Sequence, residues 1–128
     1  MEKAYSVLKN NLKFYVKFKD IIKQKKTQFY LFACDATKDT NVVIDKYYET
    51  SNIVNQIYER AKIISDWLKT LKPDDVEILK LLFVKGLKTA EVAERLDIFP
   101  SRLFRKLQKL NTKIDQYINN AISLGLEN

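Results

Sequence analysis

Apolar residues recur at helical spacing from the beginning of the chain. One row, at steps of three, four and seven residues, comprises Tyr5, Leu8, Leu12, Tyr15 and Ile22, and a second row beside it comprises Phe14, Phe18 and Ile21. Such rows line one face of an α-helix, so a helix from about Lys3 to Lys25 is expected. It either continues through residues 29–32 or gives way to a new turn at Thr27. Two apolar rows imply packing partners on more than one side.

A polar segment from Asp35 to Asn41 follows and is expected to be a loop, with Asp39, Thr40 or Asn41 capping the next helix. That helix should run from about Val42 to Leu71. Its near-heptad seam comprises Tyr47, Ser51, Val54, Tyr58, Ala61, Ile64 or Ser65, Leu68 and Leu71. The seam can pack against the first helix as an antiparallel hairpin or against a second copy of the chain, and packing within the chain is the default. Pro73 then ends the helix.

The pattern changes after Pro73 to shorter segments with clear start and stop signals. Asp74 and Asp75 suit the first turn of a helix that extends to Lys85 and ends at Gly86. Its apolar face is expected to comprise Val76, Leu79, Leu82 and Phe83. Thr89 is the expected N-cap of a short helix, Ala90 to Leu96, which turns Val92, Ala93 and Leu96 inward. Ala93 is small, as a close crossing of two helices requires.

A tight connection, Asp97 to Phe99, leads to a last helix with Pro100 in its first turn. Its inward residues are Leu103, Leu107, Leu110 and Ile114, and its basic residues are Arg102, Arg105, Lys106, Lys109 and Lys113. The spacing places the basic residues away from the apolar stripe. A basic stripe of this kind, preceded by a short capped helix and a tight turn, is typical of a helix that enters the major groove of DNA.

Two glycines and two prolines in 128 residues favour long helices. The expected fold is therefore all-α, with a long N-terminal helical hairpin followed by a C-terminal tri-helical helix-turn-helix whose last helix is extended. Residues 1–72 would form a helical region for packing, dimerisation or partner binding, and residues 73–128 a DNA-binding domain.

The composition favours a polyanionic partner and disfavours enzymatic chemistry. The formal net charge is +7, which suits nucleic acid. The chain has no histidine and a single cysteine, Cys34, and its two glycines stand too far apart for a phosphate-binding loop. No metal, cofactor or catalytic residue is expected. No apolar run approaches the length of a membrane span, so a cytoplasmic protein without membrane contact is expected.

The segment from Leu71 to Leu110 resembles the helix-turn-helix of sigma-factor region four and of phage late-transcription activators of the ArpU and RinA type. The resemblance rests on the lead-in L-K-P-D-D, the core F-V-K-G-L-K-T-A-E-V-A-E-R-L and the motif I-x-x-S-R-L that opens the last helix. It covers about a third of the chain. Asp97 stands where such families usually have glycine, and Phe99 stands where they usually have a capping serine or threonine.

The resemblance implies a recognition helix over residues 100–113 that binds double-stranded DNA. Base edges would be contacted by Ser101, Arg102, Arg105 and Lys106, and phosphates by Lys88, Thr89, Lys109 and Lys113. It implies a transcriptional regulator, of phage or mobile-element type, that binds as a homodimer or beside RNA polymerase. The alternatives are an RNA polymerase-binding adaptor or anti-sigma-like module, and a DNA-packaging protein of the small-terminase type. The last usually carries its helix-turn-helix near the N-terminus, which disfavours it here.

Overall fold

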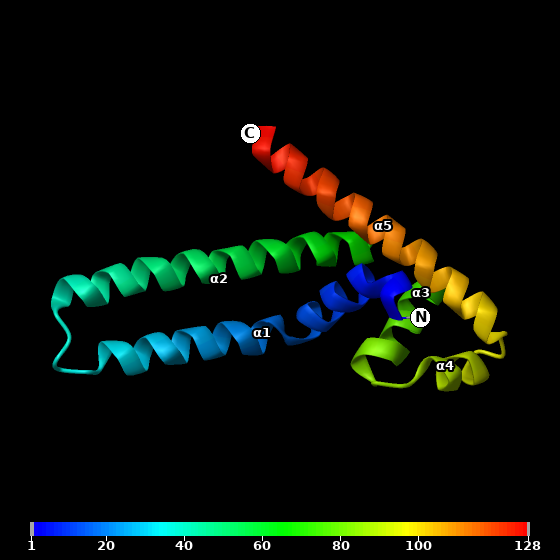
Figure 1. The fold of residues 1–128 in the computed structure, drawn as a ribbon, viewed down its shortest axis with the longest axis horizontal. Coiled ribbons are helices and arrows are strands. Elements are labelled where there is room, and N and C mark those ends of the chain that lie inside the picture. Colours follow the sequence, from blue (N-terminus) through cyan, green and yellow to red (C-terminus); the bar gives the residue numbers. More distant parts are fainter. Residues whose placement is uncertain (1, 128) are drawn as a thin grey trace. The chain divides into compact units, whose positions relative to one another are not determined.

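The computed structural model describes residues 2–127, and the side chains of residues 3–123 (Figure 1). All regular elements in this range are helical, which confirms the all-α expectation. A 3₁₀ turn, η1, and a π-helical segment, η2, accompany five α-helices. The elements are η1 (Glu2–Tyr5), α1 (Ser6–Ala33), α2 (Thr40–Leu68), α3 (Pro73–Leu79), η2 (Lys80–Val84), α4 (Thr89–Arg95) and α5 (Pro100–Glu127).

The two long helices lie where the sequence predicts them, and some of their bounds differ. The first continues past Lys25 to Ala33, which is one of the two expected alternatives, and its Phe29 ring meets Tyr47 of α2 with centroids 5.8 Å apart. The second begins at Thr40, and Asp39 is its cap: the Asp39 carboxylate accepts a hydrogen bond from the Asn41 N–H at 2.8 Å. It ends at Leu68 rather than Leu71, and residues 69–71 form turns that bond back to residues 65–68.

The helices group into two compact units, described separately here. The terminal unit comprises the described residues up to Val16 and from Ile63 onward, and the middle unit comprises Lys17–Lys62. The expected boundary at residue 72 divides the chain differently. Residues before it belong with the C-terminal helices because Tyr5, Leu8 and Trp67 are buried in the same cluster as the apolar residues of α3 to α5.

The core of the terminal unit draws on every helix within it. Its buried members are Tyr5, Leu8, Leu12, Trp67, Ile78, Leu79, Leu81, Val92, Ala93, Leu103, Leu107, Leu110 and Ile114. Two contacts tie the start of α1 to α5. The Asn111 side-chain oxygen accepts a hydrogen bond from the Leu8 N–H at 2.8 Å, and the Tyr5 and Phe104 rings meet edge to face. Asn111 thereby satisfies a backbone donor that the first turn of α1 leaves free.

The π-helical segment η2 shifts the apolar face that follows α3. The Lys85 N–H donates to the Lys80 carbonyl, five residues back, so one extra residue enters the turn. The buried residues are consequently Ile78, Leu79 and Leu81. The expected face is confirmed in part: Leu79 is buried, Leu82 and Phe83 are partly buried against the same core, and Val76 is partly buried, whereas the buried Ile78 and Leu81 were not expected.

Gly86 ends this segment as the sequence predicts. Its φ of 70° is left-handed, and the Leu87 N–H then reaches the Leu81 carbonyl at 3.0 Å. The N-cap of α4 is Lys88 rather than Thr89, which is the first helical residue. The Lys88 N–H donates to the Glu91 carboxylate at 3.3 Å, so Glu91 supplies the cap contact that was expected from threonine.

The turn between α4 and α5 is a Schellman motif. The Ile98 N–H donates to the Ala93 carbonyl at 3.0 Å, and the Asp97 N–H donates to the Glu94 carbonyl at 3.2 Å. Asp97 has a φ of 54°, so it takes the left-handed position that glycine usually occupies. The expectation that aspartate can replace glycine in this turn is confirmed.

We expect Asp97→Gly to stabilise the protein by about 0.5–1 kcal/mol, because glycine adopts this backbone geometry without the Cβ penalty. Asp97→Ala should be less stable than Asp97→Gly, since alanine keeps the Cβ and tolerates left-handed geometry less well than aspartate. Urea unfolding of the three proteins measures both differences. A parent protein more stable than Asp97→Gly would show that the turn has another requirement for the carboxylate.

In the middle unit, α1 and α2 lie side by side and are joined by the loop of residues 34–39 (Figure 1). Rings meet across them at two places, Phe18 with Tyr58 and Phe29 with Tyr47. In the loop, the Asp35 carboxylate accepts hydrogen bonds from the side chain and backbone of Thr37, which hold the pKa of Asp35 below its ordinary value. Cys34, the residue after α1, is exposed.

Candidate nucleic-acid interface

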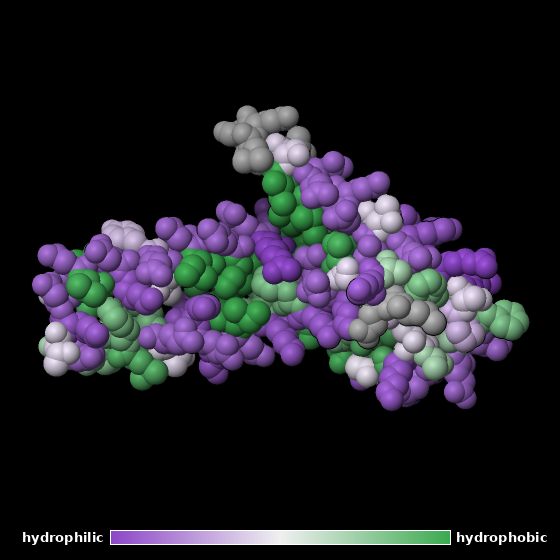
Figure 2. Space-filling view, viewed as in Figure 1, coloured by the Kyte–Doolittle hydropathy of each residue, from purple (hydrophilic) through white to green (hydrophobic). Residues whose placement is uncertain are grey.

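The first fifteen residues of α5 separate into an apolar stripe and a basic face. The stripe comprises Leu103, Leu107, Leu110 and Ile114, and each is fully buried, as the sequence predicts. The basic face comprises Arg102, Arg105, Lys109 and Lys113, which follow one another at steps of three, four and four residues. All four side chains are exposed, and so is Ser101. The outer edge of α5 is hydrophilic over most of its length in Figure 2.

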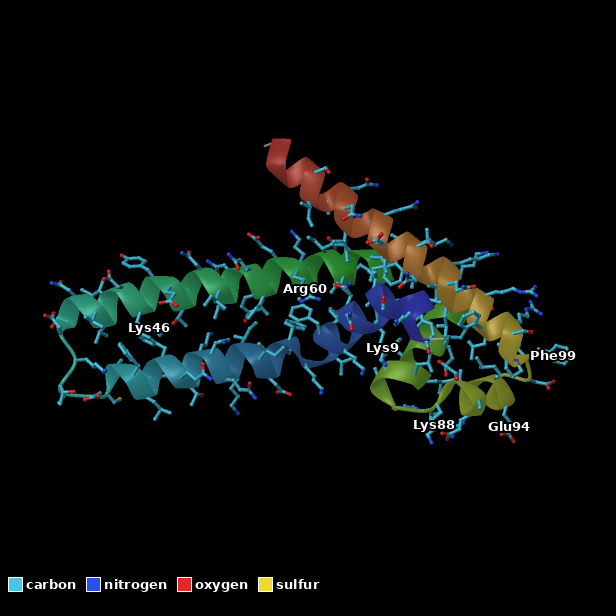
Figure 3. All side chains as sticks on the ribbon, viewed as in Figure 1. Lys9, Lys46, Arg60, Lys88, Glu94 and Phe99 are labelled. Atoms are coloured by element: carbon cyan, nitrogen blue, oxygen red, sulfur yellow. The ribbon has the colours of Figure 1, made fainter. Side chains whose placement is uncertain are left out.

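Phe99 determines where α5 begins. Its carbonyl accepts hydrogen bonds from the N–H groups of Arg102 and Leu103 at 3.0 and 3.1 Å, which makes Phe99 the cap residue and Pro100 the first helical residue. The Phe99 side chain is 79 % exposed and therefore does not pack against the helices of the terminal unit. Figure 3 shows its side chain pointing away from the ribbon at the start of α5.

Lys106 differs from its basic neighbours because it has a partner inside the terminal unit. Its Nζ lies 2.9 Å from Oδ1 of Asp75, an ion pair without the geometry of a well-directed hydrogen bond. Asp75 is only 7 % exposed, and Lys106 is partly buried. The pair joins the first turn of α3 to α5.

Sequence reasoning assigned Asp75 to the helix dipole and Lys106 to DNA, and it missed their contact. Thirty-one positions separate the two residues, so no local pattern links them. One signal was present. Lys106 directly precedes the buried Leu107 and follows the buried Leu103 by three, which places it at the edge of the apolar stripe.

We expect Lys106→Ala to destabilise the protein by about 1–2 kcal/mol, because it leaves the carboxylate of Asp75 buried without a counter-charge. The loss is smaller than for a fully buried pair because the lysine is partly exposed. Lys109→Ala, one turn away on the exposed face, should change stability by less than ~0.5 kcal/mol. Thermal unfolding measures the stabilities of Lys106→Ala and Lys109→Ala. Equal stabilities of the two variants would show that the ion pair has no structural role.

The start of α4 lies close to the start of α5. Thr89 and Ser101 both line a groove of about 440 Å³, together with Tyr5, Pro100, Leu103, Phe104 and Leu107. Lys88 and Thr89 are exposed, and Figure 3 shows Lys88 at the beginning of α4. The structure thus brings one residue expected at phosphates, Thr89, to one expected at base edges, Ser101. Glu91, Glu94 and Arg95 are all exposed on α4, so the surface of this helix is mixed in charge.

Other kinds of site find no support in the described residues. No group of histidine, cysteine, aspartate and glutamate side chains there is arranged to hold a metal ion. None of the helices described combines the length and apolar character that crossing a membrane requires. Comparisons of the chain with protein-family models, with curated proteins and with solved structures gave no significant match.

Proposed function

We propose that this chain is a transcriptional regulator that binds double-stranded DNA. In this proposal α3 with η2, α4 and α5 form a helix-turn-helix, α1 and α2 form a helical hairpin, and the N-terminal half of α5 lies in the major groove. The basic face of α5, backed by a fully buried stripe on the same helix, carries the proposal. Such a helix is held rigidly on one side and presents cations on the other, as groove recognition requires.

The dimensions of the basic face suit a groove. From Arg102 to Lys113 the helix rises by roughly 16 Å, at ~1.5 Å per residue. The major groove is about 12 Å wide and admits one α-helix. Arg102 and Arg105 lie in the first turns of α5, next to the exposed Phe99 and Ser101. We assign these two arginines to base edges, because a guanidinium can bridge the two acceptors of guanine.

The remaining cations take positioning roles. Lys109 and Lys113 continue the same face toward the C-terminus, and Lys88 and Thr89 lie at the start of α4. We assign these four residues to phosphates, which fix the register of the protein and carry no sequence information. Lys106 remains within reach of DNA through its exposed part, but the Asp75 ion pair gives it a structural role first.

A second candidate function is that of an adaptor that binds RNA polymerase. The exposed Phe99 ring and the largely apolar groove beside Ser101 favour it, because exposed apolar surface is more typical of protein contacts than of phosphate contacts. Both functions would use the same helices. They differ in the response of DNA affinity to salt, because only a DNA-binding protein makes the phosphate contacts that salt weakens.

The test is the affinity for duplex DNA across a salt series. Each phosphate contact contributes ~0.9 to the slope of log affinity against log salt, so contacts by Lys88, Lys109 and Lys113 predict a slope of roughly −3. Lys109→Ala should reduce the slope by about 1, whereas Gln108→Ala, a neighbouring exposed and uncharged position, should leave it unchanged. A flat salt dependence, or no binding to any duplex, would contradict the proposal and favour the adaptor.

A further inference from the structure

The middle unit has an unusually small core for its length. All of Lys17–Lys62 is described, and only Ile22, Val54 and Ala61 within it are buried hydrophobic residues. Seven large hydrophobic residues in the same range are exposed: Tyr30, Leu31, Val42, Ile44, Tyr47, Tyr48 and Tyr58. Helices of globular proteins owe most of their stability to packing of an apolar face. Three buried against seven exposed hydrophobic residues therefore indicate that the middle unit packs against a further surface.

The exposed side chains are not scattered. The rings of Tyr30, Phe29, Tyr47 and Tyr48 form a continuous series, with successive centroids 5.9, 5.8 and 5.6 Å apart. Tyr30 and Tyr47 line a groove of about 310 Å³ between α1 and α2, with Ser51 and Asn55 further along it. Ile44 precedes Tyr47 by three and Tyr48 by four, which places it on the same side of α2.

Tyr58 follows Ser51 by seven residues and extends this side toward the other end of the groove. We call Tyr30, Ile44, Tyr47, Tyr48 and Tyr58 the tyrosine patch.

We infer that the tyrosine patch is a self-association surface and that a second copy of this chain covers it. The area is of the right size: aromatic side chains cover ~150–250 Å² each, so the four half-exposed tyrosines, together with Ile44, offer roughly 500 Å². A standard interface takes about 800 Å² from each partner, and the stems of Lys19, Lys23 and Lys26 on the adjacent side of α1 can supply the remainder. Tyrosine is also enriched at the centres of protein interfaces.

The distribution of charged residues between α1 and α2 favours one orientation of the second copy. The part of α1 in the middle unit carries five lysines and one acid, Asp20, whereas residues 40–62 carry Asp45, Glu49 and Glu59 against three cations. Contact of α1 with its own copy would therefore set lysines against lysines. A two-fold arrangement that lays α1 on α2 of the second copy avoids this repulsion and produces a four-helix bundle.

The test is sedimentation equilibrium of the full chain over a dilution series, without DNA, so its outcome is independent of the proposed function. We expect a dimer. Tyr48→Glu and Tyr30→Glu, on different helices, should each raise the dimer dissociation constant at least ~tenfold. Val84→Glu is the matched control: Val84 is 66 % exposed, against 64 % for Tyr48, but lies in the terminal unit.

A second readout uses the native Cys34, which is exposed and single in the sequence. A spin label there should report a dipolar coupling between copies in the parent and in Val84→Glu, and none in Tyr48→Glu. Circular dichroism checks that each variant retains the helix content of the parent. A monomeric parent, a dimer that survives both tyrosine substitutions, or a dimer lost in Val84→Glu would each overturn the inference.

Discussion

The double variant Arg102→Ala, Arg105→Ala should bind a cognate duplex no more tightly than a random duplex. Both side chains are exposed in the first turns of α5, so their removal leaves the core of the terminal unit intact. A bidentate contact to a base contributes about 1–3 kcal/mol of discrimination, so losing two should cost at least ~30-fold in specific affinity. Competition binding with labelled cognate and random duplexes measures the ratio directly.

Lys109→Ala is the matched control for the arginine pair. It lies on the same face one turn later, at a position assigned to a phosphate, and should weaken cognate and random binding about equally. If the double variant discriminated as well as the parent, the assignment of α5 as the recognition helix would be wrong. If Lys109→Ala changed discrimination while the arginine pair did not, the base-reading residues would lie further along α5.

Ala93→Leu should destabilise the terminal unit by about 1–3 kcal/mol or more through overpacking. Ala93 is 1 % exposed in α4, belongs to the same buried cluster as Leu103 and Leu107 of α5, and its carbonyl also anchors the Schellman turn. Three added carbon atoms have no space there without moving one helix away from the other. DNA binding should fall with stability, because the displaced start of α5 carries Arg102.

Ala90→Leu provides the comparison on the same helix. Ala90 is exposed, so the larger side chain should change the free energy of unfolding by less than ~0.5 kcal/mol. Chemical denaturation of both variants separates a crossing effect from a general effect of leucine in α4. An unchanged midpoint for Ala93→Leu would contradict the close approach of α4 and α5 at this residue.

In the terminal unit, the sequence predicted helix ends and turns well where a residue type is strongly tied to one backbone geometry. Gly86 and Asp97 take the left-handed positions expected of them, and Pro100 opens α5. The inward stripe of α5 is confirmed in full because a single helix with one buried side repeats a simple period.

The errors came from features that no local signal marks. The π-helical segment η2 adds a residue to a turn without any glycine or proline to indicate it, and Leu81 is buried there where Leu82 and Phe83 were expected. The Asp75–Lys106 ion pair joins separate helices. The start of α1 joins the C-terminal core through Asn111, so a boundary at residue 72, based on sequence order alone, could not reflect this.

The candidate site, like the fold, was predictable from the sequence in part. The exposed positions of Arg102, Arg105, Lys109 and Lys113 follow from helical periodicity once the buried stripe is known. Thr89 and Ser101 line the same groove because of the turn between α4 and α5. The sequence indicated a turn there through Asp97, but it did not determine the direction in which α5 leaves the turn. The exposure of Phe99 could not be predicted, since an aromatic residue in a turn can equally pack inward.

Selection of bound duplexes from a random DNA pool tests the central proposal most directly. The parent protein should enrich a defined sequence over successive rounds, and the Arg102→Ala, Arg105→Ala variant should enrich none. A dimer joined through the tyrosine patch would further give a site with two-fold symmetry. Failure of the parent to enrich any sequence, at salt low enough for duplex binding, would contradict the proposal that α5 reads DNA.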